Sequence, residues 1–391
     1  MANDKSVLYL VDVFLPPTQT FVYNAIVGVQ DYRKMILTNE RINENLFPFE
    51  EQNIIKFPYY IAKDRDYHAD RVKIKAFNTA KKIIHPFLRP WLKKHFTNLV
   101  DQHNIKIMHS HFGPNGDGFI KIKKDANVKL ITEFHGHDTI PILRKEPKFY
   151  DRLFEEGDLM LAEGNAMKKI FTNHGYPAEK FAIHHLSIDL EKFPYKKRIL
   201  SKGEKIKVLF VGRFVEKKGI DYLVRAFKKV LENRKDIELI LIGDGSEMPK
   251  IKKLVEDLAL KENVHLKGFM TPDKINAEME KAHIFAHPSV TAQDGDTEGG
   301  TPTVILEAEA TGMPILATFH ADIPEQVIDK KSGLLAPERD EETLAKNLLW
   351  LIDHPKEWPK MGREGRAHIE KEYNHLIQGQ RLAKIYDSLL S

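Results

Sequence analysis

The sequence predicts an α/β protein with two doubly wound domains of similar size, each built on a parallel sheet. Short runs rich in β-branched residues alternate with amphipathic stretches, as strands alternate with helices around such sheets. The alternation occurs twice, and a polar, highly charged segment at 196–205 separates the two occurrences. That composition is typical of a domain linker. We therefore expect domains over 1–195 and 203–372 that face each other across a cleft.

Each half of the chain contributes its own set of expected strands. In the first half they cover residues 6–13, 33–38, 54–57, 107–110, 129–134, 159–162 and 181–184. In the second half they cover 206–212, 237–242, 264–267, 283–287, 315–318 and 333–336. Helices are expected in the intervals, for example at 221–233, 246–258 and 341–353. Sites in doubly wound sheets lie at the carboxyl ends of strands, so functional residues are expected in the loops that follow these runs.

The composition is that of a globular protein. The 391 residues suffice for two or three domains, and the 42% hydrophobic and 30% charged contents are ordinary. No apolar run approaches the roughly 18 residues of a membrane span. Residues 1–5 lead directly into a strand-like run rather than a signal peptide. The absence of cysteine excludes disulfides and cysteine-based metal sites, and together these features favour a cytoplasmic protein.

Positive charge is concentrated between Lys56 and Lys94, where eleven Lys and Arg face three Asp. The cations are Lys56, Lys63, Arg65, Arg71, Lys73, Lys75, Lys81, Lys82, Arg89, Lys93 and Lys94. Aromatic residues interleave with them, so the stretch suits an anionic membrane surface or an anionic acceptor. The alternative is a solvated helical face with a few core aromatics. No nucleic-acid-binding motif accompanies the charge, so nucleic acid is not an expected partner.

The loop and helix at 298–312 are the most informative part of the sequence. Thr301-Pro302 is typical of an N-cap followed by proline at the first helical position. A helix that begins there offers free backbone N–H groups to an anion. Glu307 lies too deep in that helix for a capping box, and a carboxylate on a helix whose other residues indicate burial needs a partner such as the hydroxyl groups of a ligand. The alternative is a surface glutamate on an ordinary helix.

Two cations follow the first expected strand of the second half. Arg213 ends the strand-like run, and Lys218 precedes the next helix by two residues. A guanidinium and an ammonium at a strand's carboxyl end and a helix N-terminus are placed to hold a diphosphate. Alternatively, both are surface charges.

Several segments together resemble the retaining glycosyltransferases of family GT4, which have the GT-B fold. They are VGRFVEKKGID at 211–221, LIGDG at 241–245, VHLKGF at 264–269, AHPS at 286–289 and EGGTPTVILEAEATG at 298–312, in the family's order. The resemblance implies two Rossmann-like domains, with acceptor binding at 1–195 and nucleotide-sugar binding at 203–372. It also implies that 373–391 forms a helix that crosses back to the first domain.

The resemblance implies the donor-binding residues of the second domain. Glu307 would hold the ribose hydroxyls of a nucleotide-sugar, and Glu298 would lie near the transferred sugar. Arg213 and Lys218 would bind the diphosphate. The remaining expected contacts are backbone groups of Gly299, Gly300 and Thr301 at phosphate and sugar, and of Gly268 at the nucleobase. The family usually has seven residues between its two glutamates, whereas eight separate Glu298 from Glu307, which bears on the role of Glu298.

Segments of the first half resemble the family's acceptor-binding domain. HSHFG at 109–113 and EFHGHD at 133–138 both follow expected strands. In the family the histidine before glycine, here His135, approaches the donor sugar. FLPPTQTF at 14–21 resembles the first loop of relatives that build bacterial exopolysaccharides. The residues expected on the acceptor side are Thr20, His111 and His135.

The activity implied is transfer of a sugar, with retention at the anomeric carbon, from a nucleoside-diphosphate sugar to a hydroxyl of a saccharide or lipid-linked saccharide. The implied setting is bacterial cell-surface polysaccharide synthesis at the inner face of the plasma membrane. Stabilisation of the leaving diphosphate by cations and a helix N-terminus would be the main catalytic effect, without a cofactor or metal. The expected catalytic residues are His135, Glu298, Arg213 and Lys218.

Three other patterns suggest different ligands. Asp294-Gly295-Asp296 has the spacing of the metal site in another glycosyltransferase fold, but the two cations already supply positive charge. Histidine pairs at 109/111 and 135/137 are compatible with a transition metal, which would require a further carboxylate of suitable geometry, so we expect them in the cleft or core. Gly243-x-Gly245 is half a dinucleotide fingerprint, with Met248 where a third glycine belongs.

Two functions from other classes remain as alternatives. One is a nucleotide-sugar epimerase with the same fold, which would need no acceptor. The other is a non-catalytic nucleotide-sugar-binding protein. Product analysis separates the first from a transferase, and an absence of turnover with every donor would favour the second.

Overall fold

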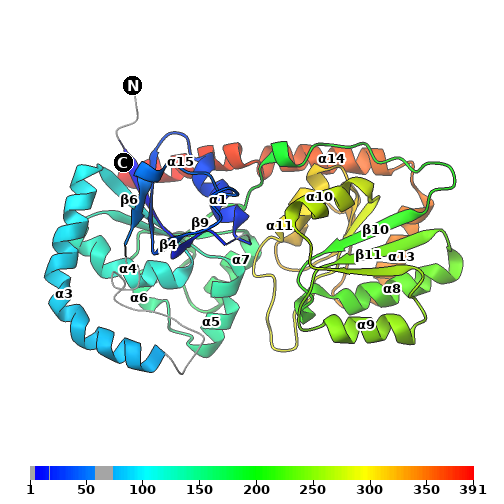
Figure 1. The fold of residues 1–391 in the computed structure, drawn as a ribbon, viewed down its shortest axis with the longest axis horizontal. Helices are drawn as coiled ribbons and strands as arrows, with labels where there is room; N and C mark the ends of the chain where they lie inside the picture. Colours follow the sequence, from blue (N-terminus) through cyan, green and yellow to red (C-terminus); the bar gives the residue numbers. More distant parts are fainter. Residues whose placement is uncertain (1–4, 17, 58–73) are drawn as a thin grey trace. The chain divides into compact units, whose positions relative to one another are not determined.

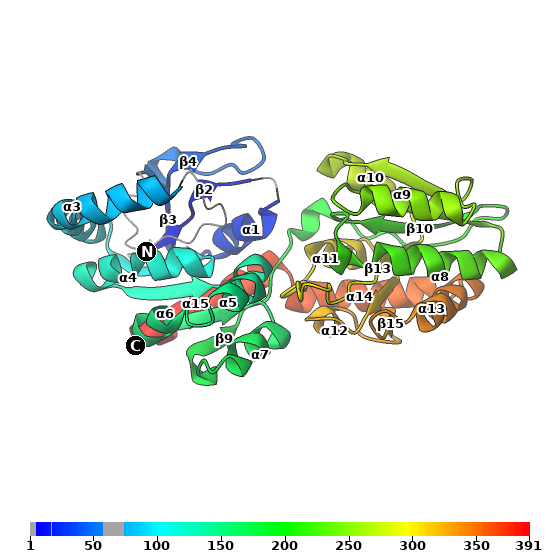
Figure 2. The same cartoon turned by 90° about the horizontal axis from the view of Figure 1, so that it is seen from below.

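The computed structural model describes residues 5–16, 18–57 and 74–391, with side chains left out at 74–86 and 137. Contacts divide the chain into two compact units, which Figures 1 and 2 show from two directions. Unit 1 is Met1–Leu186 with His375–Ser391, and unit 2 is Ser187–Asn374. Each unit is an α/β domain with its own parallel sheet, as the alternating pattern predicts.

The sheet of unit 1 has the strand order β5-β3-β1-β6-β7-β8-β9. Its strands are β1 (Ser6–Leu10), β3 (Arg33–Thr38), β5 (Ile54–Lys56), β6 (Ile105–His111), β7 (Lys129–Glu133), β8 (Leu159–Ala162) and β9 (Phe181–Ile183). All neighbouring strands are parallel. The run expected as one strand at 6–13 ends earlier, because Val13–Phe14 (β2) leaves this sheet and pairs with Glu40–Arg41 (β4).

Helices cover both faces of the first sheet, so each face has its own core. The helices are α1 (Thr20–Gly28), α3 (Ile74–Gln102), α4 (Gly113–Ala126), α5 (Ile140–Lys145), α6 (Asp151–Glu156), α7 (Asn165–Asn173) and α15 (His375–Leu390). Leu8 and Leu10 of β1 face one cluster with residues of α3, α4 and α7, whereas Val7 and Tyr9 face the other with residues of α1 and α15. The C-terminal helix α15 therefore belongs to unit 1, which confirms its expected return to the first domain.

The sheet of unit 2 has the order β12-β11-β10-β13-β14-β15. Its strands are β10 (Ile206–Val211), β11 (Ile237–Ile242), β12 (Val264–Gly268), β13 (Ile284–His287), β14 (Ile315–Thr318) and β15 (Gly333–Ala336). Its longer helices are α8 (Ile220–Asn233), α9 (Met248–Asp257), α10 (Pro272–Lys281), α11 (Thr303–Ala310), α13 (Glu341–Asp353) and α14 (Trp358–Glu372). In chain order this is 3-2-1-4-5-6, a doubly wound sheet whose order reverses between β10 and β13.

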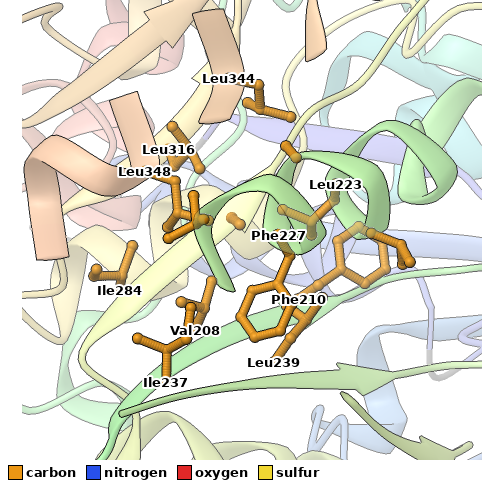
Figure 3. Close-up of a cluster of buried hydrophobic side chains, with 14 of the residues drawn as sticks. Val208, Phe210, Leu223, Phe227, Ile237, Leu239, Ile284, Leu316, Leu344 and Leu348 are labelled. Atoms are coloured by element: carbon orange, nitrogen blue, oxygen red, sulfur yellow. The ribbon is translucent and has the colours of Figure 1, made fainter. Parts of the chain in front are cut away.

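Figure 3 shows the core that fixes β10 and α8 in unit 2. Phe210 of β10 and Phe227 of α8 are fully buried. Leu348 of α13 and Leu316 of β14 complete the same cluster. Because α8 is anchored through this apolar face, the loop that joins β10 to α8 has two fixed ends.

The segment expected as a linker is attached to unit 2. The guanidinium of Arg198 is buried and donates hydrogen bonds to the carbonyl oxygens of Glu280, Ala282 and Thr311. Lys196 N–H also donates to the Thr311 carbonyl oxygen. Residues 187–202 are therefore part of unit 2, which begins earlier in the chain than the expected boundary at 203.

Much of the basic stretch at 56–94 lies outside the described residues. This applies to Lys63, Arg65, Arg71 and Lys73, and no side chain is described for Lys75, Lys81 and Lys82. Within the described part, α3 exposes Phe87 and Trp91, while Arg89 and Lys93 lie near Asp125 of α4. None of the described helices has the length and apolar character needed to cross a membrane.

Candidate active site

In unit 2 the candidate site lies at the carboxyl ends of β10 and β13, where the strand order reverses. Arg213 follows β10 by two residues, and its side chain is exposed, with no ion pair among the described residues. Glycine is required nearby at Gly243, because a Cβ there would lie 1.8 Å from the Gly212 carbonyl oxygen. Gly243, which belongs to the half dinucleotide fingerprint in the sequence, thus has a packing role. It keeps the loop after β11 in contact with the loop after β10, next to Arg213.

Lys218 and Glu298 form a close ion pair in this site. Lys218 ends a 3₁₀ turn before Gly219, whose positive φ of 61° opens α8. Its Nζ lies 2.9 Å from both carboxylate oxygens of Glu298. Ser289, two residues beyond β13, donates a hydrogen bond to the same carboxylate, and His287 Nε2 lies 3.5 Å from Glu298 Oε1.

Charge and burial fix the protonation of this cluster. Burial would raise the pKa of Glu298, but the ammonium of Lys218 and the nearby His287 and Lys217 outweigh it and hold the pKa well below its usual value. Burial, together with the charge of Lys218, lowers the pKa of His287 to about 4. At neutral pH the cluster therefore holds a carboxylate, an ammonium and a neutral imidazole.

A second pair of residues anchors the loop that carries Glu298. The backbone N–H of Glu298 donates to His320 Nε2 at 3.1 Å. His320 Nδ1 lies 2.6 Å from Glu338 Oε1, and the N–H of Thr291 donates to Glu338 Oε2 at 2.7 Å. Glu338 and His320 therefore hold both ends of the 291–298 loop.

The aspartates of the 294–296 segment both accept hydrogen bonds. Lys217 Nζ lies 3.1 Å from Asp296 and donates to the Thr297 carbonyl oxygen at 2.7 Å. Asp294 Oδ1 accepts the N–H of Asp296 at 2.9 Å. Asp294 thus bonds within its own loop, whereas Asp296 ties this loop to Lys217 of the β10–α8 loop.

The start of α11 differs from the expected cap. The helix begins at Thr303, and Pro302, with ψ of 109°, is the cap residue instead of Thr301. Because ψ at Pro302 is extended, proline ends the loop and does not open the helix. The N–H of Gly299 donates to Thr297 Oγ1 at 2.9 Å, so this donor is used within the loop. Gly300 and Thr301 are buried between the loop and the helix.

Two glutamates of α11 lie on different sides of the helix. Glu307 is half-buried, its carboxyl group makes no hydrogen bond or ion pair with any other described residue, and burial raises its pKa to about 7. Glu309 is fully buried, and burial raises its pKa to about 8. At the end of β12, Gly268 has a positive φ of 68° with open space beside it, and its carbonyl oxygen accepts the N–H of Gly243 at 2.9 Å.

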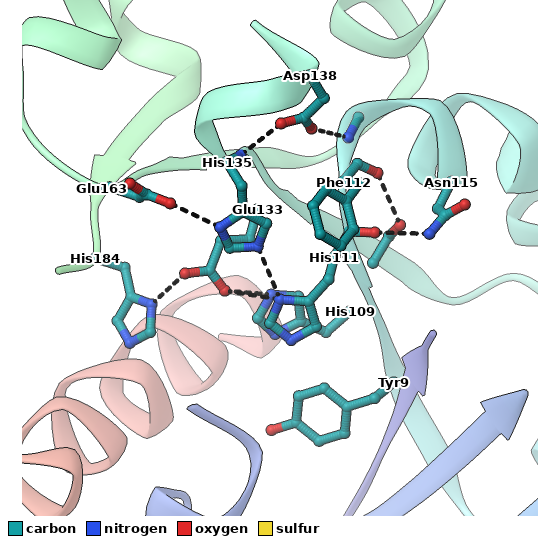
Figure 4. A network of polar contacts seen from close by, with 12 residues as sticks. Tyr9, His109, His111, Phe112, Asn115, Glu133, His135, Asp138, Glu163 and His184 are labelled. Carbon is teal, nitrogen blue, oxygen red and sulfur yellow. Dashed lines mark hydrogen bonds and ion pairs between the residues drawn. The ribbon is translucent and has the colours of Figure 1, made fainter. Parts of the chain in front are cut away.

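In unit 1 the expected acceptor-side histidines belong to a buried polar network (Figure 4). His111 ends β6, and its Nδ1 lies 3.2 Å from His135 Nε2 and 3.4 Å from Glu133 Oε2. His135 Nδ1 is 2.8 Å from Glu163. Thr20 is exposed at the start of α1, and the ring of the next residue, Phe21, lies 4.7 Å from that of His135.

The network combines charged and neutral groups. Burial would raise the pKa of Glu133, but His184, His109 and His111 lower it well below its usual value. Burial lowers the pKa of His111 well below its usual value. For His135 the lowering effect of burial is outweighed by the carboxylate of Glu163, so the pKa of His135 is raised.

The structure brings together some of the expected residues and adds others. Lys218 contacts Glu298, and His111 contacts His135. Arg213, Gly268 and Glu307 make no side-chain contact with these pairs. Other residues of the site were not expected in these roles: Ser289, His287, His320 and Glu338 in unit 2, and Glu133, Glu163 and His184 in unit 1. His109 was considered only as part of a histidine pair that could bind a metal. Glu133 is the last residue of β7 and lies directly beside His111 of β6.

Comparisons with known proteins identify the family. The model of Glycosyltransferase Family 4 matches residues 59–192, and that of glycosyl transferases group 1 matches 191–368. An amylovoran biosynthesis glycosyltransferase of Erwinia amylovora is 34% identical over 71% of this chain and 69% of its own. An Escherichia coli protein named for colanic acid biosynthesis is 30% identical over 72% and 70% of the two chains.

Solved structures share the fold at low identity. The crystal structure of an Anabaena protein in complex with UDP has a TM-score of 0.73 at 16% identity and covers 98% of this chain and 100% of its own. A glycosyltransferase from Rickettsia africae has a TM-score of 0.74 at 16% identity and covers 99% of both chains. The two Rossmann-like sheets are thus those of the GT-B fold. With relatives at 30% and 34% identity over more than two thirds of both chains, the chain belongs to the family 4 glycosyltransferases.

Proposed function

We propose that this glycosyltransferase moves a sugar from a nucleoside-diphosphate sugar to a hydroxyl of a saccharide or lipid-linked saccharide, with retention at the anomeric carbon. The observation that carries the proposal is the ion pair of Lys218 and Glu298 at the carboxyl ends of β10 and β13, with the exposed Arg213 in the same β10–α8 loop as Lys218. That edge is where doubly wound sheets bind nucleotides. The exposed guanidinium supplies a planar donor for phosphate oxygens.

Catalysis in this proposal is mainly electrostatic. As the sugar–phosphate bond breaks, negative charge grows on the leaving diphosphate, and Arg213 and Lys218 stabilise it without reorganisation. Lys218 already pairs with Glu298, so the diphosphate shares this ammonium with the carboxylate. The leaving phosphate accepts the acceptor's proton, which removes the need for a general base. With two cations in place, the donor site needs no metal or cofactor.

Glu307 is proposed to bind the ribose. Its carboxyl group has no partner among the described residues, and burial raises its pKa to about 7. Two ribose hydroxyls would donate to it and stabilise the ionised form. The backbone near Gly299, Gly300, Thr301 and Gly268 is proposed to contact the phosphate, the sugar and the nucleobase.

Unit 1 is proposed to bind the acceptor. In this proposal Thr20, His111 and His135 belong to the acceptor side, and Glu163 and His111 fix the orientation of the His135 ring. The relatives named for amylovoran and colanic acid biosynthesis support a role in bacterial cell-surface polysaccharide synthesis. The proposed location is the cytoplasm at the inner face of the plasma membrane, where the exposed Phe87 and Trp91 would contact lipid.

A thermal-shift panel of UDP, GDP, ADP and their sugars tests the donor site. A ligand at about 100 times its Kd adds roughly 2.7 kcal/mol of stability. We expect one nucleotide family to stabilise the wild type, to lose most of this effect in Glu307→Ala, and to keep it in the control Glu262→Ala, which changes an exposed residue. If no nucleotide shifts the melting temperature, the donor-site proposal fails.

Product analysis tests the reaction itself. With the stabilising donor and an acceptor oligosaccharide, we expect a glycosylated product whose anomeric configuration by NMR equals that of the donor. A converted nucleotide-sugar without acceptor would indicate the epimerase alternative, which the names of the relatives do not favour. Nucleotide binding without any turnover would indicate the non-catalytic alternative.

A further inference from the structure

We propose that His109, His111 and Glu133 of unit 1 bind one divalent transition-metal ion, for which Zn²⁺ is the best match. Two histidines and one carboxylate are a common ligand set for such ions. The sequence pattern supplies the histidine pair but no carboxylate, and the structure brings Glu133 to it. The proposal concerns unit 1 alone and does not depend on the donor proposed for unit 2.

The strand register places the three side chains together. His109 and His111 are two residues apart on β6, so both point to the same face of the sheet. Glu133 is the residue of β7 that lies directly beside His111 in the parallel ladder. One nitrogen of each histidine and one oxygen of Glu133 all lie within 4.8 Å of one another.

The distances suit a tetrahedral ion. Glu133 Oε2 lies 3.3 Å from His109 Nε2 and 3.4 Å from His111 Nδ1. In a tetrahedral site with bonds of about 2.05 Å, neighbouring ligand atoms lie about 3.3 Å apart. Two of the three distances between ligand atoms therefore already match those of a tetrahedral zinc site.

Neighbouring groups orient two of the ligands. His109 Nδ1 is 2.6 Å from the hydroxyl of Tyr386 in α15. Glu133 Oε1 is 2.9 Å from His184 Nδ1, which leaves Oε2 directed at the histidine pair (Figure 4). Metal ligands in proteins commonly have partners of this kind, which fix the ring or carboxylate orientation.

Burial gives an independent reason for a bound ion. His109, His111 and Glu133 are completely buried. Within the described residues, His109 Nε2 and Glu133 Oε2 face each other at 3.3 Å without the geometry of a hydrogen bond, and His109 Nε2 has no other partner. A buried carboxylate oxygen that faces two imidazole nitrogens at 3.3 and 3.4 Å is poorly satisfied, and an ion bound between these atoms explains the arrangement. Three protein ligands would leave a fourth position for water or a hydroxyl oxygen.

Metal titration of the full chain tests the proposal. After removal of metal with a chelator, we expect wild-type protein to bind one equivalent of Co²⁺ with the visible absorption of a tetrahedral site, and Zn²⁺ to displace it. We expect His109→Ala and Glu133→Gln to abolish the absorption. We expect Tyr386→Phe, which removes only a hydroxyl, to weaken binding about 10–100-fold. His174→Ala, at an exposed histidine of the same unit, is the matched control and should bind like the wild type.

The metal titration of the wild type tests the proposal by itself, even if a variant with a substitution in the core fails to fold. A wild-type chain that binds no Co²⁺ or Zn²⁺ in this titration would overturn the proposal, and so would binding that survives in a folded His109→Ala protein. Failure of the nucleotide thermal shift would leave the metal result unchanged, so the two proposals fail separately.

Discussion

Lys218 and Arg213 both supply positive charge to the proposed donor site, but their surroundings differ. Lys218 is largely buried against Glu298, whereas Arg213 is exposed and has no charged partner among the described residues. We expect each change to alanine to lower kcat by about 10²–10³ through loss of charge stabilisation. Only Lys218→Ala should also destabilise the fold, by about 3 kcal/mol, because it leaves the Glu298 carboxylate buried and unpaired.

Steady-state kinetics and urea unfolding of the two variants measure these effects. The two proteins serve as controls for each other, since both lose one cation from the same edge of the sheet. Near-normal turnover in both would contradict the electrostatic mechanism. Equal stability of Lys218→Ala and wild type would contradict the structural role of the ion pair.

The raised pKa of Glu307 predicts a pH-dependent stability. In the fold its carboxyl group has a pKa of about 7, above the value near 4.5 of the unfolded chain. The folded state therefore binds more protons between these values, and stability falls as pH rises from about 4.5 to 7. Without ligand, Glu307→Gln should remove this contribution, on the order of 3 kcal/mol.

Urea unfolding at pH 5 and pH 8 measures the difference in the free energy of unfolding between wild type and Glu307→Gln. We expect the variant to be the more stable protein at pH 8 and the two to be similar at pH 5. Glu309→Gln is a useful comparison. Burial raises the pKa of Glu309 to about 8, so its contribution to stability should also fall as pH rises. A stability difference that does not change with pH would show that Glu307 is ionised in the free protein.

His320 should influence the reaction without touching the substrate. Its Nε2 must be unprotonated to accept the N–H of Glu298, and Nδ1 faces Glu338. We expect His320→Ala to lower kcat about tenfold, consistent with one lost hydrogen bond, with a smaller effect on KM. The exposed His354→Asn is the control. A larger change in KM than in kcat would indicate that His320 holds the donor and not the loop.

Sequence suggests candidate site residues where a suitable residue type follows a strand or precedes a helix, as for Arg213 and Lys218. His111 and His135 came from the family resemblance, and all four stay predictions. His320 and Glu338 were not, because they follow β14 and β15 and reach Glu298 only through the order of strands in the folded sheet. Glu133 was missed for the same reason, since its partners depend on the register of β7 with β6.

At the scale of elements, periodicity located helices well and their ends less well. The expected helix at 341–353 matches α13, and the one at 221–233 begins one residue later than α8. The expected strand at 6–13 was too long, because a bend after Leu10 sends β2 to a different partner. Local sequence does not encode such a change of partner.

The contact between α1 and α15 allows a test of close helix packing. A Cβ added at Gly379 would lie 1.9 Å from the carbonyl oxygen of Gly28. Since that atom is backbone and cannot move alone, we expect Gly379→Ala to destabilise the protein by about 1–3 kcal/mol. Ser388→Ala, at an exposed position of the same helix, should change stability by less than about 0.5 kcal/mol. Thermal unfolding of both variants measures this, and an unchanged Gly379→Ala would contradict the packing.

At the scale of the whole molecule, sequence could predict two parallel sheets but not where the first unit ends. The charged segment before Ile206 has the composition of a linker, yet Arg198 ties it to unit 2 through three carbonyl oxygens. A buried guanidinium that donates to backbone carbonyl oxygens cannot be recognised from the amino-acid composition of the segment. The family resemblance supplied the return of the C-terminal helix, which hydrophobic periodicity alone would not have assigned to unit 1.

The division into units predicts that fragments behave differently. Residues 187–374 contain a complete sheet and core, so we expect this fragment to fold alone and unfold cooperatively. Residues 1–186 lack α15, which covers Tyr9 and contributes Leu382 and Tyr386 to the core. We expect them to remain unfolded or aggregate unless 375–391 is supplied. Circular dichroism and thermal melts measure both, and a stable 1–186 fragment would contradict the assignment of α15.

The return of α15 also sets an order of events during synthesis. Unit 1 is made of the first and the last residues of the chain, and unit 2 is inserted between them. A ribosome finishes every residue of unit 2 before it reaches Tyr386, the partner of both Tyr9 and His109. The strands translated first must therefore wait, incompletely covered, until all of unit 2 and then α15 have been synthesised, and the histidine network of unit 1 is completed only after that.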